Sequence, residues 1–368
     1  MAQPTTNTAW TIPATATAVK HLTKVEKDVP TPGRNQVLVR LTGASLNFRD
    51  ILVSTHSPNY PGPHKPDLIA CSDGAGLVHS TGPSSVWAGK EGTPVVLHPS
   101  TWLSGDVRNL RLDQIYGAMA NDGTLQKWIV VDDERVIAAP KGLSGVESSS
   151  LITAGVTAWA AIRGSLDGRF DGGLDEWKGA WTEKRLEGTW VLTQGTGGVS
   201  CFAIQIAAVL GATVIATSSS DSKLDVAKSL GATHVINYAK MPEWDQEVLR
   251  LTDGKGVDHV IEVAGAQTLM KSVNSARAGG LISLIGILSE AETLPAALVP
   301  SLLFGGKIIK GCVAFNRDMT AEFVNFVEKN GIKPVVAETF AFDEAVGAFE
   351  ALQKQSAVGK IAVKISDE

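Results

Sequence analysis

The chain has 368 residues, more than one hydrophobic core comfortably fills, so one large or two moderate domains are expected, and we favour two. Apolar residues make up 44% and charged residues 19% of it, a mix typical of an ordinary globular protein. The net charge of -5, with acidic and basic residues interspersed, provides no basic stripe for a nucleic-acid backbone, which excludes nucleic acid as an expected partner.

The three cysteines, Cys71, Cys201 and Cys312, lie far apart and form no CxxC pair, so neither a disulfide framework nor a zinc ribbon is indicated. The first residues, "MAQPTTNTAWTIPATATAVK", place Thr, Pro and Trp where a secretory signal needs an unbroken apolar core. No stretch of about 18 apolar residues occurs that could span a membrane. We therefore predict reduced thiols, a cytoplasmic location and no membrane partner.

From about residue 14 to residue 133, short apolar runs such as "QVLVRLTGASL" are broken by Gly and Pro, which predicts a compact, mainly antiparallel β domain. The next segment, "SSSLITAGVTAWAAI", has helical character, with Ser148 as its candidate N-cap. Residues 163–188 are rich in Gly and charge, so we predict a long surface loop there.

From Thr189 onward, apolar strand-like runs alternate with helical segments. The runs are "TWVLTQG", "TVIATSS", "HVINY", "VDHVIEVAG" and "LISLIGI". This alternation predicts βαβ units that wind a parallel sheet with helices on its faces. The last part, from "KIIKGCVAFNR" to "GKIAVKI", adds strand, helix and strand, which either complete the first domain or extend the sheet.

A dinucleotide fingerprint follows the first of these strands: Gly195, Gly197 and Ser200 hold the GxGxxG/A positions. The first glycine permits a tight turn, the second lets the backbone approach a pyrophosphate, and a small third residue lets helix and strand pack closely. The amino terminus of the following helix would face the diphosphate. Because strand and helix flank the motif, it predicts dinucleotide binding.

The second strand ends in "TSSSDSK", where an NAD-preferring site usually carries an acid that binds the ribose hydroxyls. Ser218, Ser219 and Lys223 would instead stabilise a 2′-phosphate, which favours NADP(H). Asp221 is either the ribose acid displaced by a few residues or the N-cap of the next helix, and we favour the cap.

The segments "GTGGVS", "TSSSDSK", "LGATHVINY", "GVDHVIEVAG" and "GGLISLIGIL" together resemble the medium-chain dehydrogenase/reductase superfamily, in its zinc-independent, quinone-oxidoreductase-like or enoyl-reductase-like branch. The likeness extends to "GASLNFRD", "SDGAGLV", "GVTAW" and "VGKIAVKI", and so covers almost the whole chain. It implies an α/β fold with a GroES-like, mainly-β catalytic domain (residues 1–152 and 313–368) around a Rossmann domain with a doubly wound parallel sheet (residues 153–312).

The resemblance also implies that Ser219, Lys223 and Tyr238 contact the adenosine phosphate, although Tyr238 could simply cap a strand and pack. It implies that the stretches 263–265, 285–287 and 314–316 line the nicotinamide. The predicted cofactor-binding residues are Thr157, Gly195, Thr196, Gly197, Gly198, Val199, Ser218, Ser219, Lys223, Tyr238, Val263, Ala264, Ile285, Gly286, Ala314 and Phe315.

Zinc-dependent members of that superfamily carry a Cys, a His-Glu pair and a later Cys or Asp at the catalytic positions, and often a four-cysteine lobe. This chain has Asn47 and then Ser72-Asp73 at the corresponding places, and the lobe is missing. A set of Cys71, His64 and Asp73 lies within too short a loop to match the spacing of known sites. We therefore predict no metal.

Without a Lewis acid, direct oxidation of a simple alcohol loses its main electrostatic aid, whereas an activated double bond can place its charge on a carbonyl oxygen held by hydrogen-bond donors. We predict hydride transfer from NADPH to an enone, enal, quinone or enoyl thioester, followed by protonation of the enolate. The candidate catalytic residues are Asn47, which orients substrate or nicotinamide ribose, and Tyr60, which binds the carbonyl or supplies the proton. Arg49 and Asp50 are expected to form a structural ion pair.

Alternatives remain at this point. Leu52 replaces a tyrosine that quinone oxidoreductases keep, which weakens a strict quinone-reductase assignment. The chain could instead be a metal-free alcohol dehydrogenase or carbonyl reductase, or a nucleotide-binding protein without catalysis. Relatives commonly pair through a sheet edge of the cofactor domain, so a homodimer is the expected partner state besides the small-molecule substrate, and "LISLIGIL" could be that edge or merely core.

Overall fold

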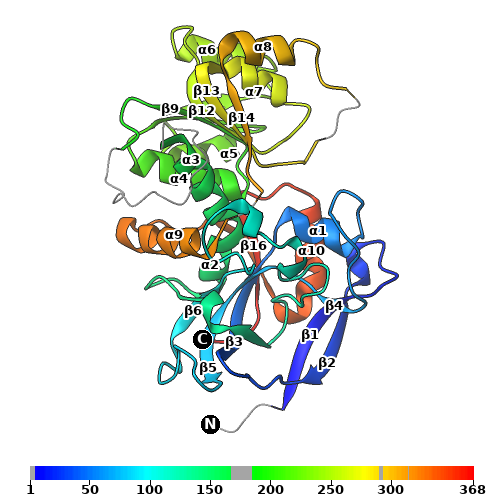
Figure 1. Cartoon of the computed structure of the whole chain (residues 1–368). Helices are drawn as coiled ribbons and strands as arrows, with labels where there is room; N and C mark the ends of the chain where they lie inside the picture. The colour runs from blue at the N-terminus through cyan, green and yellow to red at the C-terminus, as the bar shows by residue number, and fades with distance from the viewer. Residues whose placement is uncertain (1–4, 167–184, 290–292, 314) are drawn as a thin grey trace. The chain divides into compact units, whose positions relative to one another are not determined.

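The computed structural model describes residues 5–166, 185–289, 293–313 and 315–368 (Figure 1). The chain folds into two compact units, one formed by residues 1–156 with 315–368 and the other by residues 157–314. The first unit thus takes both ends of the chain, while the second is one continuous segment.

The first unit is built on a seven-stranded sheet with the order β15-β16-β3-β5-β6-β8, in which β7 also pairs with β3. All of these pairs are antiparallel except β15 with β16, which confirms the mainly antiparallel β prediction. The strands are β3 (Gln36–Ser45), β5 (Asp73–Thr81), β6 (Pro94–Leu97), β7 (Trp128–Asp132), β8 (Val136–Ala138), β15 (Val336–Ala341) and β16 (Lys360–Lys364).

A smaller sheet of the same unit has the order β2-β1-β4. Its strands are β1 (Thr6–Ile12), β2 (Thr23–Asp28) and β4 (Leu68–Ile69), and the unit's helices include α1 (Phe48–Ser54), α9 (Arg317–Asn330) and α10 (Ala345–Gln353). Alternate residues of the central strand β3, Val37, Val39 and Leu41, point into a core that Phe349 of α10 and Val363 of β16 complete. The last strand therefore packs into the middle of the first unit.

The register of the central strands decides which polar side chains meet. Ser45, the last residue of β3, pairs with Asp73 of β5 on one side and with Ala362 of β16 on the other. The antiparallel register with β16, continued by two residues, sets Lys360 opposite Asn47. Residues 47, 73 and 360 are thereby brought together although they are far apart in the sequence.

The helical segment before the second unit begins earlier than predicted. α2 (Gly145–Ser150) starts at the N-cap Ser144, whose hydroxyl accepts from the Glu147 N–H while the Glu147 carboxylate accepts from the Ser144 N–H. Ser148 is therefore not the cap but a buried residue inside the helix. A π-type helical turn, η5 (Leu151–Val156), follows. The predicted loop at 163–188 is wrong at its start, because residues 163–166 end the helix α3 (Thr157–Leu166), and residues 167–184 lie outside the described residues.

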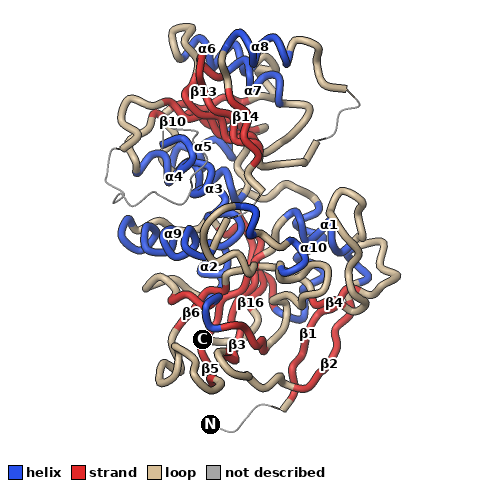
Figure 2. Tube along the Cα trace, viewed as in Figure 1, coloured by secondary structure: helices blue, strands red, loops and turns tan. Residues whose placement is uncertain are grey.

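The second unit holds a six-stranded, fully parallel sheet with the order β11-β10-β9-β12-β13-β14, and helices and strands alternate along it (Figure 2). Its strands are β9 (Trp190–Gln194), β10 (Thr213–Ser218), β11 (His234–Asn237), β12 (Val257–Glu262), β13 (Ala276–Leu284) and β14 (Ile308–Gly311), and its helices are α3 (Thr157–Leu166), α4 (Gly198–Val209), α5 (Asp221–Ser229), α6 (Trp244–Leu251), α7 (Leu269–Ser275) and α8 (Leu298–Gly305). The neighbours β9 and β12 are not consecutive, so the strand order reverses there, which confirms the doubly wound prediction. Ligands of such sheets bind outside the carboxyl ends of the strands at this point.

Two open questions about the end of the chain are settled by this topology. β14, from "KIIKGCVAFNR", extends the parallel sheet, whereas α9, β15 and β16 complete the first unit. The segment "LISLIGIL" lies largely in β13, between β12 and β14, so the idea that it forms the sheet edge is wrong. β14 takes that edge instead.

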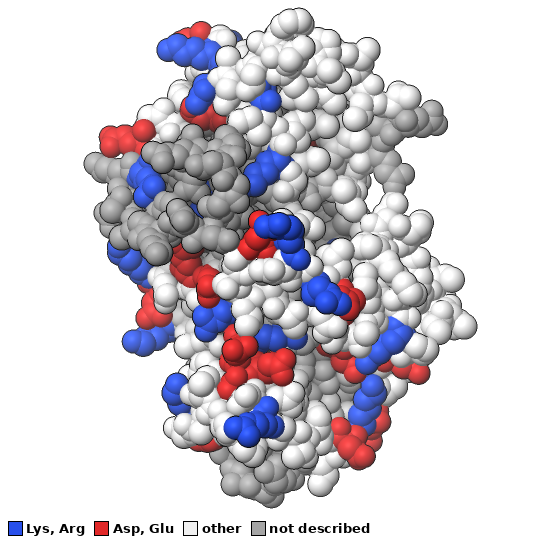
Figure 3. All heavy atoms as spheres, viewed as in Figure 1, with Lys and Arg blue, Asp and Glu red and all other residues white. Residues whose placement is uncertain are grey.

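Lysine, arginine, aspartate and glutamate are interspersed over the face of the molecule drawn in Figure 3, without a broad patch of one sign. Over the described residues, the structure contains no helix with the length and apolar composition needed to cross a membrane.

Candidate functional site

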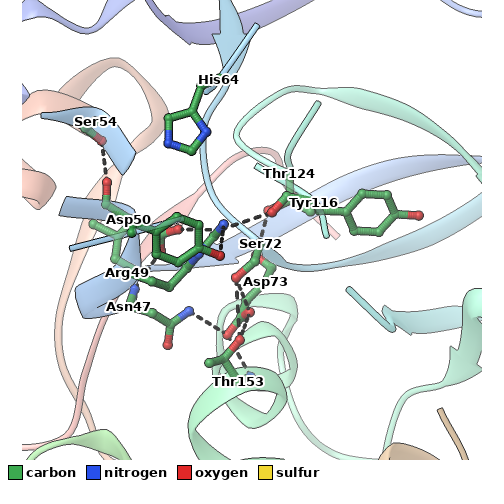
Figure 4. A network of polar contacts seen from close by, with 12 residues as sticks. Asn47, Arg49, Asp50, Ser54, His64, Ser72, Asp73, Tyr116, Thr124 and Thr153 are labelled. Atoms are coloured by element: carbon green, nitrogen blue, oxygen red, sulfur yellow. Dashed lines mark hydrogen bonds and ion pairs between the residues drawn. The ribbon is translucent and has the colours of Figure 1, made fainter. Parts of the chain in front are cut away.

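Asn47 stands at the start of α1, in the turn that follows β3. Its backbone N–H donates to the Asp50 carboxylate (2.8 Å), which fixes the first turn of the helix. Its buried side chain donates from Nδ2 to Asp73 Oδ2 (2.9 Å) (Figure 4). Its Oδ1 accepts from Lys360 Nζ (2.6 Å). An amide has two N–H donors, so one Nδ2–H is left that donates to none of the described residues and can bind a ligand.

Asp73 begins β5 and is completely buried. Both of its carboxylate oxygens accept hydrogen bonds. Oδ1 accepts from Ser72 Oγ (2.8 Å) and Thr153 Oγ1 (2.5 Å), and Oδ2 accepts from the Thr153 N–H (2.9 Å) as well as from Asn47. Thr153 lies in the π-type turn η5, which places its N–H and hydroxyl side by side on the carboxylate. The acid is therefore saturated with donors from the protein itself.

Lys360 brings a buried ammonium group into the same cluster. Burial lowers the pKa of Lys360, and the nearby carboxylates of Asp73 and Asp50 oppose that shift. Nζ donates to the Leu46 carbonyl as well as to Asn47 Oδ1. The cluster thus contains a fixed cation that is part of the polypeptide.

Arg49 connects α1 to Tyr60. Its Nη1 pairs with Asp50 Oδ1 (3.0 Å), which confirms the predicted ion pair, and also donates to the Tyr116 carbonyl (3.0 Å). Its Nη2 donates to the Tyr60 hydroxyl (3.0 Å). Because a guanidinium can only donate, the Tyr60 oxygen accepts in this hydrogen bond. The Tyr60 hydroxyl therefore keeps its own O–H as a donor that can make one further hydrogen bond.

His64 and Cys71 lie close to this cluster. His64 Nδ1 accepts from the Met119 N–H (2.9 Å), and the His64 and Tyr60 ring centroids are 6.0 Å apart. Burial lowers the pKa of His64 and raises the pKa of the Cys71 thiol well above its usual range. Among the described residues, no group of three or more His, Cys, Asp or Glu side chains is arranged to hold a metal ion.

The glycine-rich turn of the second unit has the backbone that a diphosphate requires. Gly195 has a φ of +68°, which L side chains rarely adopt, and a Cβ built on Gly197 meets nothing within 4 Å. Helix α4 starts next to Gly197 without a side-chain cap, so its first N–H groups remain available to an anion. Ser200 Oγ donates to the Gln194 carbonyl (2.7 Å) and closes the turn. These residues fit a dinucleotide diphosphate.

At the end of β10, Ser218 precedes the exposed Ser219 and the cap of α5. The N-cap is Ser220, whose Oγ accepts from the Lys223 N–H (3.4 Å), so the interpretation of Asp221 as the cap is wrong. Asp221 is the first helical residue because a serine directly before it already satisfies the cap. Its carboxylate accepts instead from Asn237 Nδ2 (2.7 Å) and Lys240 Nζ (2.5 Å).

Tyr238 follows β11, and its N–H donates to the Ser218 carbonyl (3.0 Å), which places it beside the end of β10. Its side chain is 42% exposed. Lys223 is half-buried, and no carboxylate of the described residues pairs with its ammonium. Ser218, Lys223 and Tyr238 therefore come from neighbouring elements of one sheet end, as their predicted common role requires, and the role itself stays a prediction.

The residues predicted to line the nicotinamide lie in different parts of the structure. Those at the carboxyl ends of β12 and β13 lie together, and a Cβ on Gly286 would come within 1.6 Å of the Val263 carbonyl oxygen, so only glycine fits there. Phe315 belongs to the first unit, where its buried ring packs 5.8 Å from His98. Thr157 opens α3, and Ala314 lies outside the described residues.

Sequence reasoning missed Lys360 and Thr153 in the first unit, and Gln194, Lys240 and Glu262 in the second. Two of these had a visible signal. Lys360 begins the apolar strand "KIAV", and Glu262 ends the apolar strand "VIE", so each is a charged residue in an otherwise buried run. Thr153 had no such signal, since its role depends on a π-type turn.

Comparisons with known proteins match both units. A family model described as an alcohol dehydrogenase GroES-like domain matches residues 33–141, and one described as a zinc-binding dehydrogenase matches residues 198–329. A zinc-type alcohol dehydrogenase-like protein of Schizosaccharomyces pombe is 37% identical over 346 residues, which are 92% of this chain and 94% of that protein.

Solved structures of other proteins are also similar to this chain. A structure of an NAD-dependent alcohol dehydrogenase is similar with a TM-score of 0.82 and 30% identity, over 98% of this chain and 100% of that one. A crotonyl-CoA carboxylase/reductase in complex with NADP has a TM-score of 0.81 at 22% identity, over 99% of this chain and 96% of that one, and so shares the fold.

Proposed function

Because the chain belongs to the medium-chain dehydrogenase/reductase superfamily, and so is an oxidoreductase of the zinc-type alcohol dehydrogenase-like kind, we propose that it uses NADPH to reduce an activated carbon–carbon double bond without a metal. The substrate class is an enone, enal, quinone or enoyl thioester, each of which conjugates the double bond to a carbonyl. The observation that carries the proposal is the buried Lys360 ammonium bonded to Asn47 beside Asp73.

The zinc of zinc-dependent relatives does not fit this set of side chains. Zinc prefers thiolate, imidazole and carboxylate ligands, and a catalytic site needs three of them from the protein. Asn47 offers an amide already bonded to Lys360, and both oxygens of Asp73 accept from protein donors. A dication would have to displace these bonds and lie beside a buried ammonium, which Coulomb repulsion opposes. No step of the proposed reaction passes through a metal.

The proposed roles of Tyr60 and Asn47 in the first unit follow from the hydrogen-bond donors that each keeps available. When bound, the reduced nicotinamide would supply a hydride to the β-carbon of the substrate, which leaves an enolate whose negative charge is shared by the α-carbon and the carbonyl oxygen. Tyr60 donates its O–H to that oxygen, and Arg49 holds the phenol by its own N–H. The uncommitted N–H of Asn47 orients the substrate or the nicotinamide ribose. A proton taken up from water then adds to the α-carbon and completes the reduction.

The choice of NADPH is supported by the charges at the end of β10. Lys223 has an unpaired ammonium among the described residues, and the exposed Ser219 provides a hydroxyl donor, whereas the buried Ser218 Oγ already bonds to Thr196 Oγ1 (3.3 Å). Asp221, the acid that would favour NADH, accepts from Lys240 and Asn237 instead. One similar structure is of an NAD-dependent alcohol dehydrogenase and another is a complex with NADP, and titration of this protein with both dinucleotides tests the choice.

We also propose that two copies pair through the edge strand β14. Its outer backbone N–H and C=O groups pair with no described strand, and the adjacent helix α8 exposes Val299 (69%), Leu303 (71%) and Phe304 (86%). A strand edge is complementary to itself under a two-fold axis, so a second copy fits it. Light scattering of wild-type and Phe304→Glu protein tests this: a dimer that the substitution dissociates supports it, and a wild-type monomer contradicts it.

The main proposal is tested by following NADPH consumption with enones and quinones and, separately, with simple aldehydes, on protein whose metal content is measured. Turnover of enones by metal-free protein supports it. Turnover of aldehydes with inert enones would support the alternative, a carbonyl reductase or alcohol dehydrogenase. NADPH binding with no substrate turned over would favour a protein without catalysis.

A further inference from the structure

Glu262, the last residue of β12, is completely buried at the carboxyl edge of the parallel sheet. No lysine, arginine or histidine among the described residues forms an ion pair with it. Five neutral donors share its charge instead. Oε1 accepts from Ala264 N (2.9 Å), Gly265 N (2.9 Å) and Thr268 Oγ1 (2.8 Å), and Oε2 accepts from Gln194 Nε2 (2.7 Å) and Ser272 Oγ (2.5 Å). A buried charge is costly unless it is bonded this fully.

Gln194 connects this carboxylate to the glycine-rich turn, since it is the residue directly before Gly195. Its Nε2 donates to Glu262 and to Ser272 Oγ (2.6 Å), and its Oε1 accepts from the Val263 N–H (3.3 Å). The opposite amide orientation would turn Oε1 toward the carboxylate, so the partners fix the side chain in one orientation. The side chain therefore bridges the ends of β9 and β12.

The loop after β13 is fastened to the same structure. The Ile285 N–H donates to the Glu262 carbonyl (2.9 Å), and Ser289 donates to the Ala264 carbonyl from both its N–H and its Oγ (2.8 Å each). Gly286 packs directly on the Val263 carbonyl, where no Cβ fits. The backbone at 263–265 and at 285–289 is thus held as one piece around Glu262.

We propose that the Gln194–Glu262 pair couples the diphosphate turn to the loops after β12 and β13, and so positions the nicotinamide half of the cofactor relative to its diphosphate. This inference rests on the dinucleotide binding in the proposed function, and it names two positioning residues that need not touch the cofactor. A site keeps its geometry when bonds behind it lock the backbone that forms it. The adenosine half, held at the ends of β10 and β11, does not depend on these bonds.

The test compares Glu262→Gln with wild type for two ligands, NADPH and 2′,5′-ADP, which carries only the adenosine half. A glutamine at 262 has one acceptor oxygen, so its NH2 group must face either the Ala264 and Gly265 N–H groups or the Gln194 NH2 group. We expect the Kd for NADPH to rise about tenfold, because this corresponds to the loss of about one charged hydrogen bond. The Kd for 2′,5′-ADP should change less than about twofold.

Asp245→Asn is the matched control, because it makes the same change of carboxylate to amide at a buried acid of the same unit, on α6, where the partner is Asn274 (3.0 Å). It should leave the ratio of the two Kd values as in wild type. The reciprocal double variant Gln194→Glu with Glu262→Gln keeps a carboxylate facing an amide, so it should melt closer to wild type than Gln194→Glu, which sets two carboxylates together.

The outcomes separate this inference from the function on which it rests. An equal loss of affinity for both ligands in Glu262→Gln, or no loss for either, would overturn the coupling alone. A double variant that melts below Gln194→Glu would also count against it. Failure of wild-type protein to bind NADPH and NADH would overturn the proposed function and the coupling together.

Discussion

Replacing Lys223 with alanine should weaken NADPH binding about tenfold and leave NADH binding almost unchanged. Lys223 lies in the first turn of α5, shortly after Ser218 and Ser219 in the chain, and its ammonium pairs with no carboxylate of the described residues. Charge-assisted hydrogen bonds contribute about 1.5–3 kcal/mol. Because Lys223 is only half-buried, solvent and salt screen it, so we expect the lower value, about 1.5 kcal/mol, or about a factor of ten in Kd.

The assay is a fluorescence titration of the protein with NADPH and with NADH at fixed ionic strength. Lys228→Ala is the control, since Lys228 lies in the last turn of the same helix and pairs with Asp225 (3.5 Å). Lys240→Ala adds a second test: it removes the cation bound to Asp221 and should weaken NADPH binding in the same direction. An unchanged ratio of the two affinities in Lys223→Ala would refute the reasoning, as would an equal loss for both dinucleotides.

Three other predictions concern the first unit and the buried histidines. Tyr60→Phe should lower kcat about 10²–10³-fold, as expected when one hydrogen-bond donor to a developing oxyanion is removed, with little change in melting temperature. An unchanged kcat in steady-state kinetics would exclude Tyr60 as the donor to the carbonyl oxygen. Lys360→Met should destabilise the fold by about 3 kcal/mol in urea unfolding, because it leaves buried acids with one cation fewer, and a gain in stability would contradict this. Burial lowers the pKa of His98 and of His259 to about 3, so below their unfolded pKa of about 6.5 the unfolded chain binds protons that the folded chain does not. Stability should therefore fall as the pH drops from about 6.5 toward 3, by up to about 1.4 kcal/mol per pH unit for each histidine, and a flat urea midpoint over that range would contradict the assignment.

The sequence was sufficient for features that depend on local pattern. The βαβ alternation after Thr189 and the glycine-rich turn at Gly195 were predicted because strand and helix periodicities and the turn residues lie within a few positions of one another. The N-cap residues of helices were predicted less well, because several adjacent residues can each cap a helix. The observed N-caps are Ser144 and Ser220, where Ser148 and Asp221 were predicted.

The polar clusters depend on pairing that local pattern does not contain. Lys360 meets Asn47 across 313 positions of sequence, through the register of β16 on β3. Gln194 meets Glu262 only because β9 and β12 are neighbours in the sheet although they are not consecutive. Likewise, the edge position of β14 follows from strand order and not from its composition.

One measurement tests the metal-free reduction of a conjugated double bond most directly. Protein dialysed against a chelator and shown to lack stoichiometric zinc is given an enone and NADPH that carries deuterium at C4 of the nicotinamide. We predict turnover with deuterium at the β-carbon of a saturated ketone. An allylic alcohol with deuterium at the carbinol carbon, or activity that returns only when zinc is added, would contradict the account.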